Sequence, residues 1–184
     1  MNALVLIAGL LCYAITGVVV RSHFSSTSVP RGVYVSILLS YVGVAAFVWL
    51  MLRDHHAVAV LAAALGLFAA SNALFFWTVA TTRSQRLRLA YDPEPPGFLV
   101  QVGPYRYIRH PFYASYILFW LGCAVATQHP LSLAFLIAMV AFALVAAFRE
   151  ERSFEGTPFA AEYRRYRQTA GLLWPRFGAS NSLR

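Results

Sequence analysis

Long uncharged apolar runs alternate with short polar segments along this chain of 184 residues. Three runs occupy residues 2–20, 33–52 and 57–80, and two more occupy residues 111–127 and 131–148. Each run is about as long as the roughly 20 residues with which a helix crosses a hydrocarbon core of about 30 Å. The pattern therefore predicts an all-α integral membrane protein with five transmembrane helices.

The polar segments between the runs predict how the helices are connected. Residues 21–32 form a loop broken by Pro30, whereas residues 128–130 leave room only for a tight antiparallel hairpin. Residues 81–110 hold three prolines within four positions, so a helix cannot continue there, and we predict an interfacial connector. The charged residues 149–184 cannot span a bilayer, and we expect them to fold over one face of the bundle, with residues 179–184 frayed.

The composition supports a single membrane domain over residues 1–184. Hydrophobic residues make up 59% of the chain and charged residues only 12%, about half the share of a typical soluble domain. A net charge of +8 would suggest a nucleic-acid partner in a soluble protein, but here the basic residues lie between and after apolar runs. We therefore predict a membrane partner and no nucleic acid.

All fifteen basic side chains are arginines, and their distribution predicts the orientation of the chain. Fourteen lie in the first loop, the connector and the tail, and one lies in the second loop. The positive-inside rule places the side with fourteen arginines in the cytoplasm and the amino terminus outside. A chain rich in arginine and free of lysine suggests a GC-rich genome, so we predict a bacterial inner membrane protein.

Two cysteines, Cys12 and Cys123, lie within apolar runs. Their spacing matches neither a metal site nor a disulfide framework. We interpret both as small packing residues and predict no bound metal.

Two polar clusters are predicted to meet at the cytoplasmic face. Residues 103–113 precede the fourth apolar run and residues 149–152 follow the fifth, so the hairpin brings the clusters together. Adjacent carboxylates at the end of a membrane helix require cationic or hydroxyl partners, and Arg109 and His110 are the nearest candidates for Glu150 and Glu151. The cluster fits either a ligand that carries a carboxylate, an amine and vicinal hydroxyls, as S-adenosylmethionine does, or a solvated structural group without a ligand.

The sequence GPYRYIRHPFYASY, followed by EERSF and AEYRRYR, resembles the isoprenylcysteine carboxyl methyltransferase family and the related phospholipid N-methyltransferases. The resemblance covers residues 99–175. It implies a membrane methyltransferase that uses S-adenosylmethionine and modifies a lipophilic small molecule or lipid. It also implies that the cofactor lies between residues 99–113 and 149–175, beneath a cytoplasmic helical lid.

The resemblance also implies roles for individual residues. The cofactor-binding residues would be Gln101, Val102, Gly103, Tyr105, Arg109, His110, Pro111, Tyr113, Glu150 and Glu151. A tail helix carrying Tyr163 and Tyr166 would pack over the cofactor. We hypothesise in addition that Arg149 and Glu151 are catalytic, with Arg149 steering an anionic acceptor and Glu151 orienting the cofactor or the acceptor, and that His110 binds the amino-acid end of the cofactor.

Several alternatives stay open at the level of sequence. One is a membrane reductase of the sterol-reductase type that uses NADPH, and another is a scaffold whose polar cluster is structural. The acceptor itself, the choice between O-, N- and S-methylation, the oligomeric state and the roles of the first three helices also stay open.

Overall fold

The computed structural model describes residues 1–23, 31–83 and 97–177. Most of the predicted first loop, the proline-rich part of the predicted connector and the predicted frayed end lie outside the described residues. Within the described ranges all regular secondary structure is helical, apart from an isolated bridge between Ile108 and Gly171. The predicted all-α fold class is therefore confirmed for this part of the chain.

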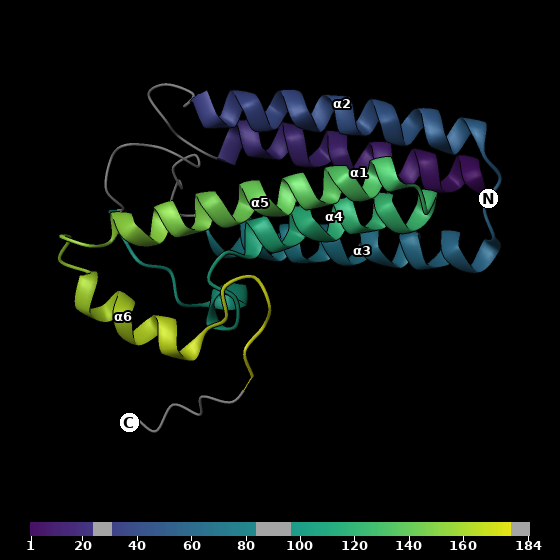
Figure 1. The fold of residues 1–184 in the computed structure, drawn as a ribbon. Helices are drawn as coiled ribbons and strands as arrows, with labels where there is room; N and C mark the ends of the chain where they lie inside the picture. The colour runs from purple at the N-terminus through teal and green to yellow at the C-terminus, as the bar shows by residue number, and fades with distance from the viewer. Residues whose placement is uncertain (24–30, 84–96, 178–184) are drawn as a thin grey trace.

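Five long helices run side by side in one bundle, and a sixth helix lies beyond the end of the bundle that is opposite to the amino terminus (Figure 1). The elements, in chain order, are α1 (Asn2–His23), α2 (Arg31–Arg53), α3 (Val58–Thr81), the 3₁₀ helix η1 (Gly103–Arg106), α4 (Pro111–Thr127), α5 (Pro130–Ser153) and α6 (Ala160–Thr169). The end of the bundle nearest to α6 is called the α6 end below.

Four helices among the described residues, α1, α2, α3 and α5, are long and apolar enough to cross a membrane. Large apolar side chains such as Val18, Leu38, Leu52 and Ile137 are exposed on their outer faces. Because α4 has 17 residues, its length is about 25 Å, somewhat short of a hydrocarbon core of about 30 Å. The chain thus has the helices of an integral membrane protein, and the five-span topology with its orientation stays a prediction.

Helix α4 occupies the centre of the bundle. It contacts α1, α2, α3 and α5, and it packs most extensively against α3. Phe119 and Trp120 of α4 pack with Phe47 and Phe68 in the main hydrophobic core. A helix enclosed by four neighbours does not need to match the bilayer thickness by itself, which explains why α4 can be the shortest of the five.

The predicted hairpin between residues 128 and 130 is present. Gln128 ends α4 in the left-handed conformation, with φ of 48°, and its N–H group donates to the carbonyl of Ala124. The Nδ1 atom of His129 accepts from the N–H group of Leu131, and Pro130 takes the first position of α5. Helices α4 and α5 are therefore antiparallel neighbours.

Helix α5 is longer than the apolar run from which it was predicted. It continues past Phe148 to Ser153, because arginine and glutamate are good helix formers and extend the helix beyond the apolar residues. At 24 residues, α5 exceeds α4 by about 10 Å. Glu150 and Glu151 thus lie on the last turns of α5 instead of after it, level with the segment that precedes α4.

Candidate functional site at the α6 end

The segment before α4 is held against the end of α3. Gly103 has a φ of +59°, which favours glycine, and a Cβ atom there would lie 2.2 Å from the Thr81 Oγ1 atom. Pro104 and Tyr105 of η1 are buried, and the Tyr166 hydroxyl of α6 donates to the Tyr105 carbonyl at 2.5 Å. This close packing fixes the path of the chain toward Arg109 and His110.

The segment that follows α6 pairs with the segment that precedes α4. The N–H group of Arg109 donates to the Gly171 carbonyl at 2.7 Å, and the Gly171 N–H group donates to the Tyr107 carbonyl at 3.0 Å. Two further bonds run from His110 to the Leu172 carbonyl and from Arg176 to the Tyr107 carbonyl. These four backbone bonds, called the tail pairing below, hold α6 over the α6 end of the bundle.

The carboxylate of Glu151 is at the centre of a charged cluster. Its side chain is only 5% exposed, and its Oε1 atom accepts from Arg109 Nε at 2.8 Å. His110 Nε2 lies 3.4 Å from the same oxygen, and Arg167 Nε lies 3.4 Å from Oε2. Three cationic or ionisable groups from two segments, the one before α4 and α6, therefore surround one buried carboxylate, which compensates for its burial.

Arg109 joins α5 to α6. Besides the bond to Glu151, its guanidinium donates to the Ala170 carbonyl at 2.5 Å and to the Arg167 carbonyl at 3.2 Å. Carbonyls at the end of a helix have no partner within the helix, and a cation there is favoured by the helix dipole. Arg109 thus stabilises the docked position of α6, while its predicted role in cofactor binding stays a prediction.

Glu150 connects two further predicted site residues. The Tyr113 hydroxyl donates to Glu150 Oε1, and His110 Nδ1 lies 3.3 Å from Glu150 Oε2. The rings of His110 and Tyr113 are stacked, with centroids 5.6 Å apart. The predicted convergence of the segment before α4 on the end of α5 is thus present.

Two buried polar atoms near this cluster lack a hydrogen-bond partner among the described residues: His110 Nε2 and the Tyr163 hydroxyl. The His110 atom has Glu151 within ion-pair distance, but not in hydrogen-bonding geometry. Burial raises the pKa of Tyr163, and the charge of Glu151 raises it further. Buried polar groups without partners are uncommon, and they mark places where a ligand or water can bind.

The remaining predicted site residues lie around the cluster. The Gln101 amide donates to Glu162 of α6 at 2.5 Å, and Gly103 faces Thr81 of α3. Val102 is exposed, Pro111 begins α4, and Arg149 is exposed on α5. The roles predicted for these residues stay predictions.

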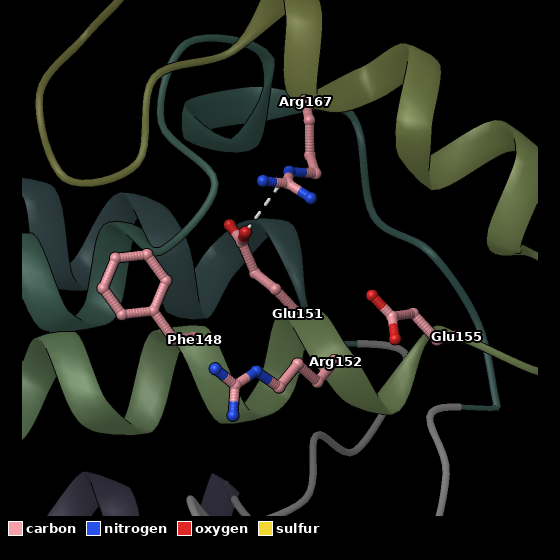
Figure 2. A pocket seen from close by; sticks show the side chains of 5 residues that line it. All are labelled: Phe148, Glu151, Arg152, Glu155 and Arg167. Atoms are coloured by element: carbon pink, nitrogen blue, oxygen red, sulfur yellow. Dashed lines mark ion pairs between the residues drawn. The ribbon is translucent and has the colours of Figure 1, made fainter.

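Sequence reasoning placed Glu151 and Arg152 in a polar cluster but did not identify the other residues that line the pocket beside Glu151, which are Phe148, Glu155 and Arg167. The pocket has a volume of about 230 Å³ and is lined by Phe148, Glu151, Arg152, Glu155 and Arg167. Figure 2 shows Arg167 reaching from α6 toward Glu151 on α5. Helix α6 carries three arginines, Arg164, Arg165 and Arg167. No local signal in the sequence indicated which of them would meet a glutamate.

The surroundings of His110 predict a pH-dependent stability. Burial lowers its pKa, but the neighbouring carboxylates of Glu150 and Glu151 raise it more, so the pKa in the folded state lies above the usual 6.5. The stability that protonated His110 contributes is therefore complete below pH 6.5 and is lost as the pH rises through the folded-state pKa. We expect thermal unfolding of the wild type to shift downward above pH 6.5, and the shift to be smaller in His110→Gln. Identical pH profiles of the two proteins would contradict this expectation.

We expect the conservative substitution Tyr163→Phe to stabilise the protein. In Tyr163→Phe the ring stack on Phe154, with centroids 4.2 Å apart, is retained, and only the hydroxyl without a partner is removed. We expect the unliganded protein to become more stable, by about 1 kcal/mol, since a buried polar group without a partner is costly. Tyr166→Phe is the matched control: it loses the bond to the Tyr105 carbonyl and should destabilise the protein. Denaturation of both variants measures the difference in sign.

Comparison with known proteins agrees with the position of the site. Residues 90–160, less than half of the chain, match the phospholipid methyltransferase family. The matched region includes the segment before α4, the hairpin, and Glu150 and Glu151. A search of curated protein sequences finds no match to the chain. Together with the apolar helices, the family match supports a membrane methyltransferase.

Proposed function

We propose that this chain is an integral membrane methyltransferase of the isoprenylcysteine carboxyl methyltransferase type, which transfers a methyl group from S-adenosylmethionine to a lipophilic acceptor. The observation that carries the proposal is the cluster of Arg109, His110, Glu150 and Glu151 at the end of the α4–α5 hairpin. This cluster lies within the region that matches phospholipid methyltransferases. We further propose that the α6 end is cytoplasmic and that α6 is part of a lid.

The residues of the cluster fit the polar end of S-adenosylmethionine. Glu150 and Glu151 suit an amino group, and Arg167 or protonated His110 suits a carboxylate. The two buried polar atoms without partners, His110 Nε2 and the Tyr163 hydroxyl, offer further hydrogen bonds. Tyr105 and Tyr113 add aromatic surface beside these charges. The cofactor-binding set predicted from the sequence is retained in the proposal, with Tyr163 and Arg167 added.

When bound, S-adenosylmethionine supplies an electrophilic methyl group on a sulfonium sulfur, and an in-line displacement depends on positioning and on exclusion of water. The tail pairing and Arg109 hold α6 over the cluster and limit the access of water. A carboxylate acceptor needs no base, and we assign Arg149 to steer it. An amine acceptor must lose a proton, and Glu150, whose side chain is 38% exposed, is the carboxylate best placed to receive it.

Phospholipid N-methylation is the second candidate function. It is favoured by the family that residues 90–160 match. The two candidates share the cofactor and differ in the atom that is methylated, so the chemistry of the product distinguishes them.

The proposal is tested with the full chain purified in detergent. We expect S-adenosylhomocysteine, but not NADPH, to raise the temperature of unfolding, because a ligand that binds only the folded state stabilises it. Label from tritiated S-adenosylmethionine should then appear in a component of a total lipid extract. Label released by alkali indicates a methyl ester, and alkali-stable label on an amine indicates N-methylation. Stabilisation by NADPH would favour a reductase, and stabilisation by neither ligand would favour a scaffold; either result contradicts the proposal.

A further inference from the structure

Two strongly exposed aromatic side chains lie outside the long helices. Trp174 is 68% exposed and Phe177 is 76% exposed, and both belong to the segment that follows α6. Among the described residues, the other exposed large hydrophobic side chains lie on the long helices, apart from Met1 and Val102. Exposed apolar side chains on membrane helices contact lipid, so the two aromatic side chains of the tail are the ones that need a partner.

The tail pairing sets the level of these side chains relative to the bundle. Its backbone bonds join residues 171–172 to residues 109–110, directly before Pro111, where α4 starts. In Figure 1 the chain after α6 turns back toward the start of α4. Helix α4 is packed among four helices of membrane-spanning length and is about 25 Å long, whereas a hydrocarbon core is about 30 Å thick. We therefore expect the tail to lie at the boundary between the hydrocarbon core and the headgroups.

Two arginines accompany the aromatic side chains of the tail. Phe177 packs against the ring of Tyr107, with centroids 5.5 Å apart, and the guanidinium carbon of Arg106 lies 6.0 Å from the centroid of the same ring. Arg176 is exposed next to Phe177, and its N–H group donates to the Tyr107 carbonyl. Arg106 is exposed as well. These four residues and Trp174 are called the tail patch below, and the patch combines aromatic surface with two positive charges.

Tryptophan is favoured at the level of lipid headgroups, and arginines at that level attract anionic lipids. We propose that the tail patch binds anionic phospholipids of the surrounding membrane, with its two exposed aromatic side chains at the boundary of the acyl chains and its two arginines beside the lipid phosphates. Bound lipid then supports the tail pairing, and through it the docked position of α6. The inference goes beyond methyl transfer, because the tail patch contains no residue of the charged cluster around Glu151.

The test uses the full chain in lipid nanodiscs and the quenching of tryptophan fluorescence by brominated lipids. The difference between the wild type and Trp174→Phe isolates the emission of Trp174. We expect lipids brominated near the headgroup end of their acyl chains to quench this emission. Trp49, isolated in the same way by Trp49→Phe, is the control. It is exposed near the end of α2, where the Asp54 carbonyl accepts from Asn2, and therefore lies at the other end of the bundle from α6 (Figure 1).

The charge of the lipid is tested in discs of equal parts of phosphatidylcholine and phosphatidylglycerol, with one of the two brominated at a time. We expect brominated phosphatidylglycerol to quench Trp174 more strongly than brominated phosphatidylcholine. Arg106→Gln and Arg176→Gln should each lower the relative affinity for phosphatidylglycerol by about fivefold, the worth of one arginine near an anionic membrane surface. Arg106→Lys and Arg176→Lys keep the charge and should keep the preference. Quenching of Trp49 should not respond to any of these substitutions.

Two outcomes overturn the inference. Absence of Trp174 quenching by any brominated lipid would place the tail patch in water, or against a second copy of the chain if cross-linking in the same discs yields dimers. Equal quenching of Trp174 by the two lipids in the wild type would mean apolar contact without recognition of charge. Neither outcome decides the proposed function, which is tested separately by binding of S-adenosylhomocysteine.

Discussion

Replacing Glu151 by glutamine is expected to destabilise the protein by about 3–5 kcal/mol and to abolish methyl transfer. The substitution keeps the shape of the side chain but removes the charge that compensates Arg109, which is 11% exposed and has no other carboxylate within ion-pair distance among the described residues. Leaving one member of a buried ion pair without its partner is strongly destabilising. Denaturation in detergent measures the loss of stability, and the tritium-transfer assay measures the loss of activity.

Glu155→Gln is the matched control for this prediction. Glu155 lines the same pocket but is exposed in the turn after α5, so its substitution should change stability by less than about 1 kcal/mol. If Glu151→Gln unfolded at the same denaturant concentration as Glu155→Gln, Glu151 would not be the residue that holds the cluster together.

Gly171→Ala is expected to release α6 from the bundle and to lower methyl transfer by about a hundredfold, since small displacements of positioning groups have effects of that size. A Cβ atom at Gly171 would lie 2.0 Å from the Trp174 carbonyl oxygen, so the turn that follows α6 must open. Opening this turn breaks the tail pairing, in which Gly171 takes part through both its N–H and its carbonyl group. The bundle itself should stay folded, because its core lies among α1 to α5.

Trypsin can detect the released tail, because α6 carries Arg164, Arg165 and Arg167. We expect rapid cleavage in this helix for Gly171→Ala and slow cleavage for the wild type. Gly66→Ala is the control, since a Cβ atom on that glycine of α3 would meet no atom within 4 Å. Slow cleavage and full activity of Gly171→Ala would show that the tail tolerates the side chain.

Much of the bundle could be predicted because its helices are encoded locally. Uncharged runs of membrane-spanning length identify the helices, and Pro111 and Pro130 mark where α4 and α5 begin. Because the turn between those helices is short, the residues at their other ends must lie close together. His110 and Glu151 were predicted to meet on this basis, and His110 Nε2 lies 3.4 Å from Glu151 Oε1.

The charged partners could not be predicted in the same way, because they depend on where α6 docks. The ten residues of α6 contain three arginines, and which of them meets a glutamate is decided by the tail pairing at Gly171, a backbone contact without a sequence signature. Arg109 illustrates the same limit. Its type and position suggested a ligand contact, but its bonds to the Ala170 and Arg167 carbonyls also give it a structural role. The end of α5 was placed too early, at residue 148, because loss of apolar character was taken as the end of the helix.

The tail pairing has a consequence for biosynthesis. The backbone groups that pair with residues 107–110 belong to residues 171–176, which leave the ribosome only after all five helices of the bundle. Until then, Glu151 has Arg109 and His110 as its neighbours but lacks Arg167. The tail pairing and the contact of Arg167 with Glu151 can therefore form only after every helix of the bundle has been synthesised. A chain truncated after residue 170 should therefore contain all five helices of the bundle but lack the tail pairing.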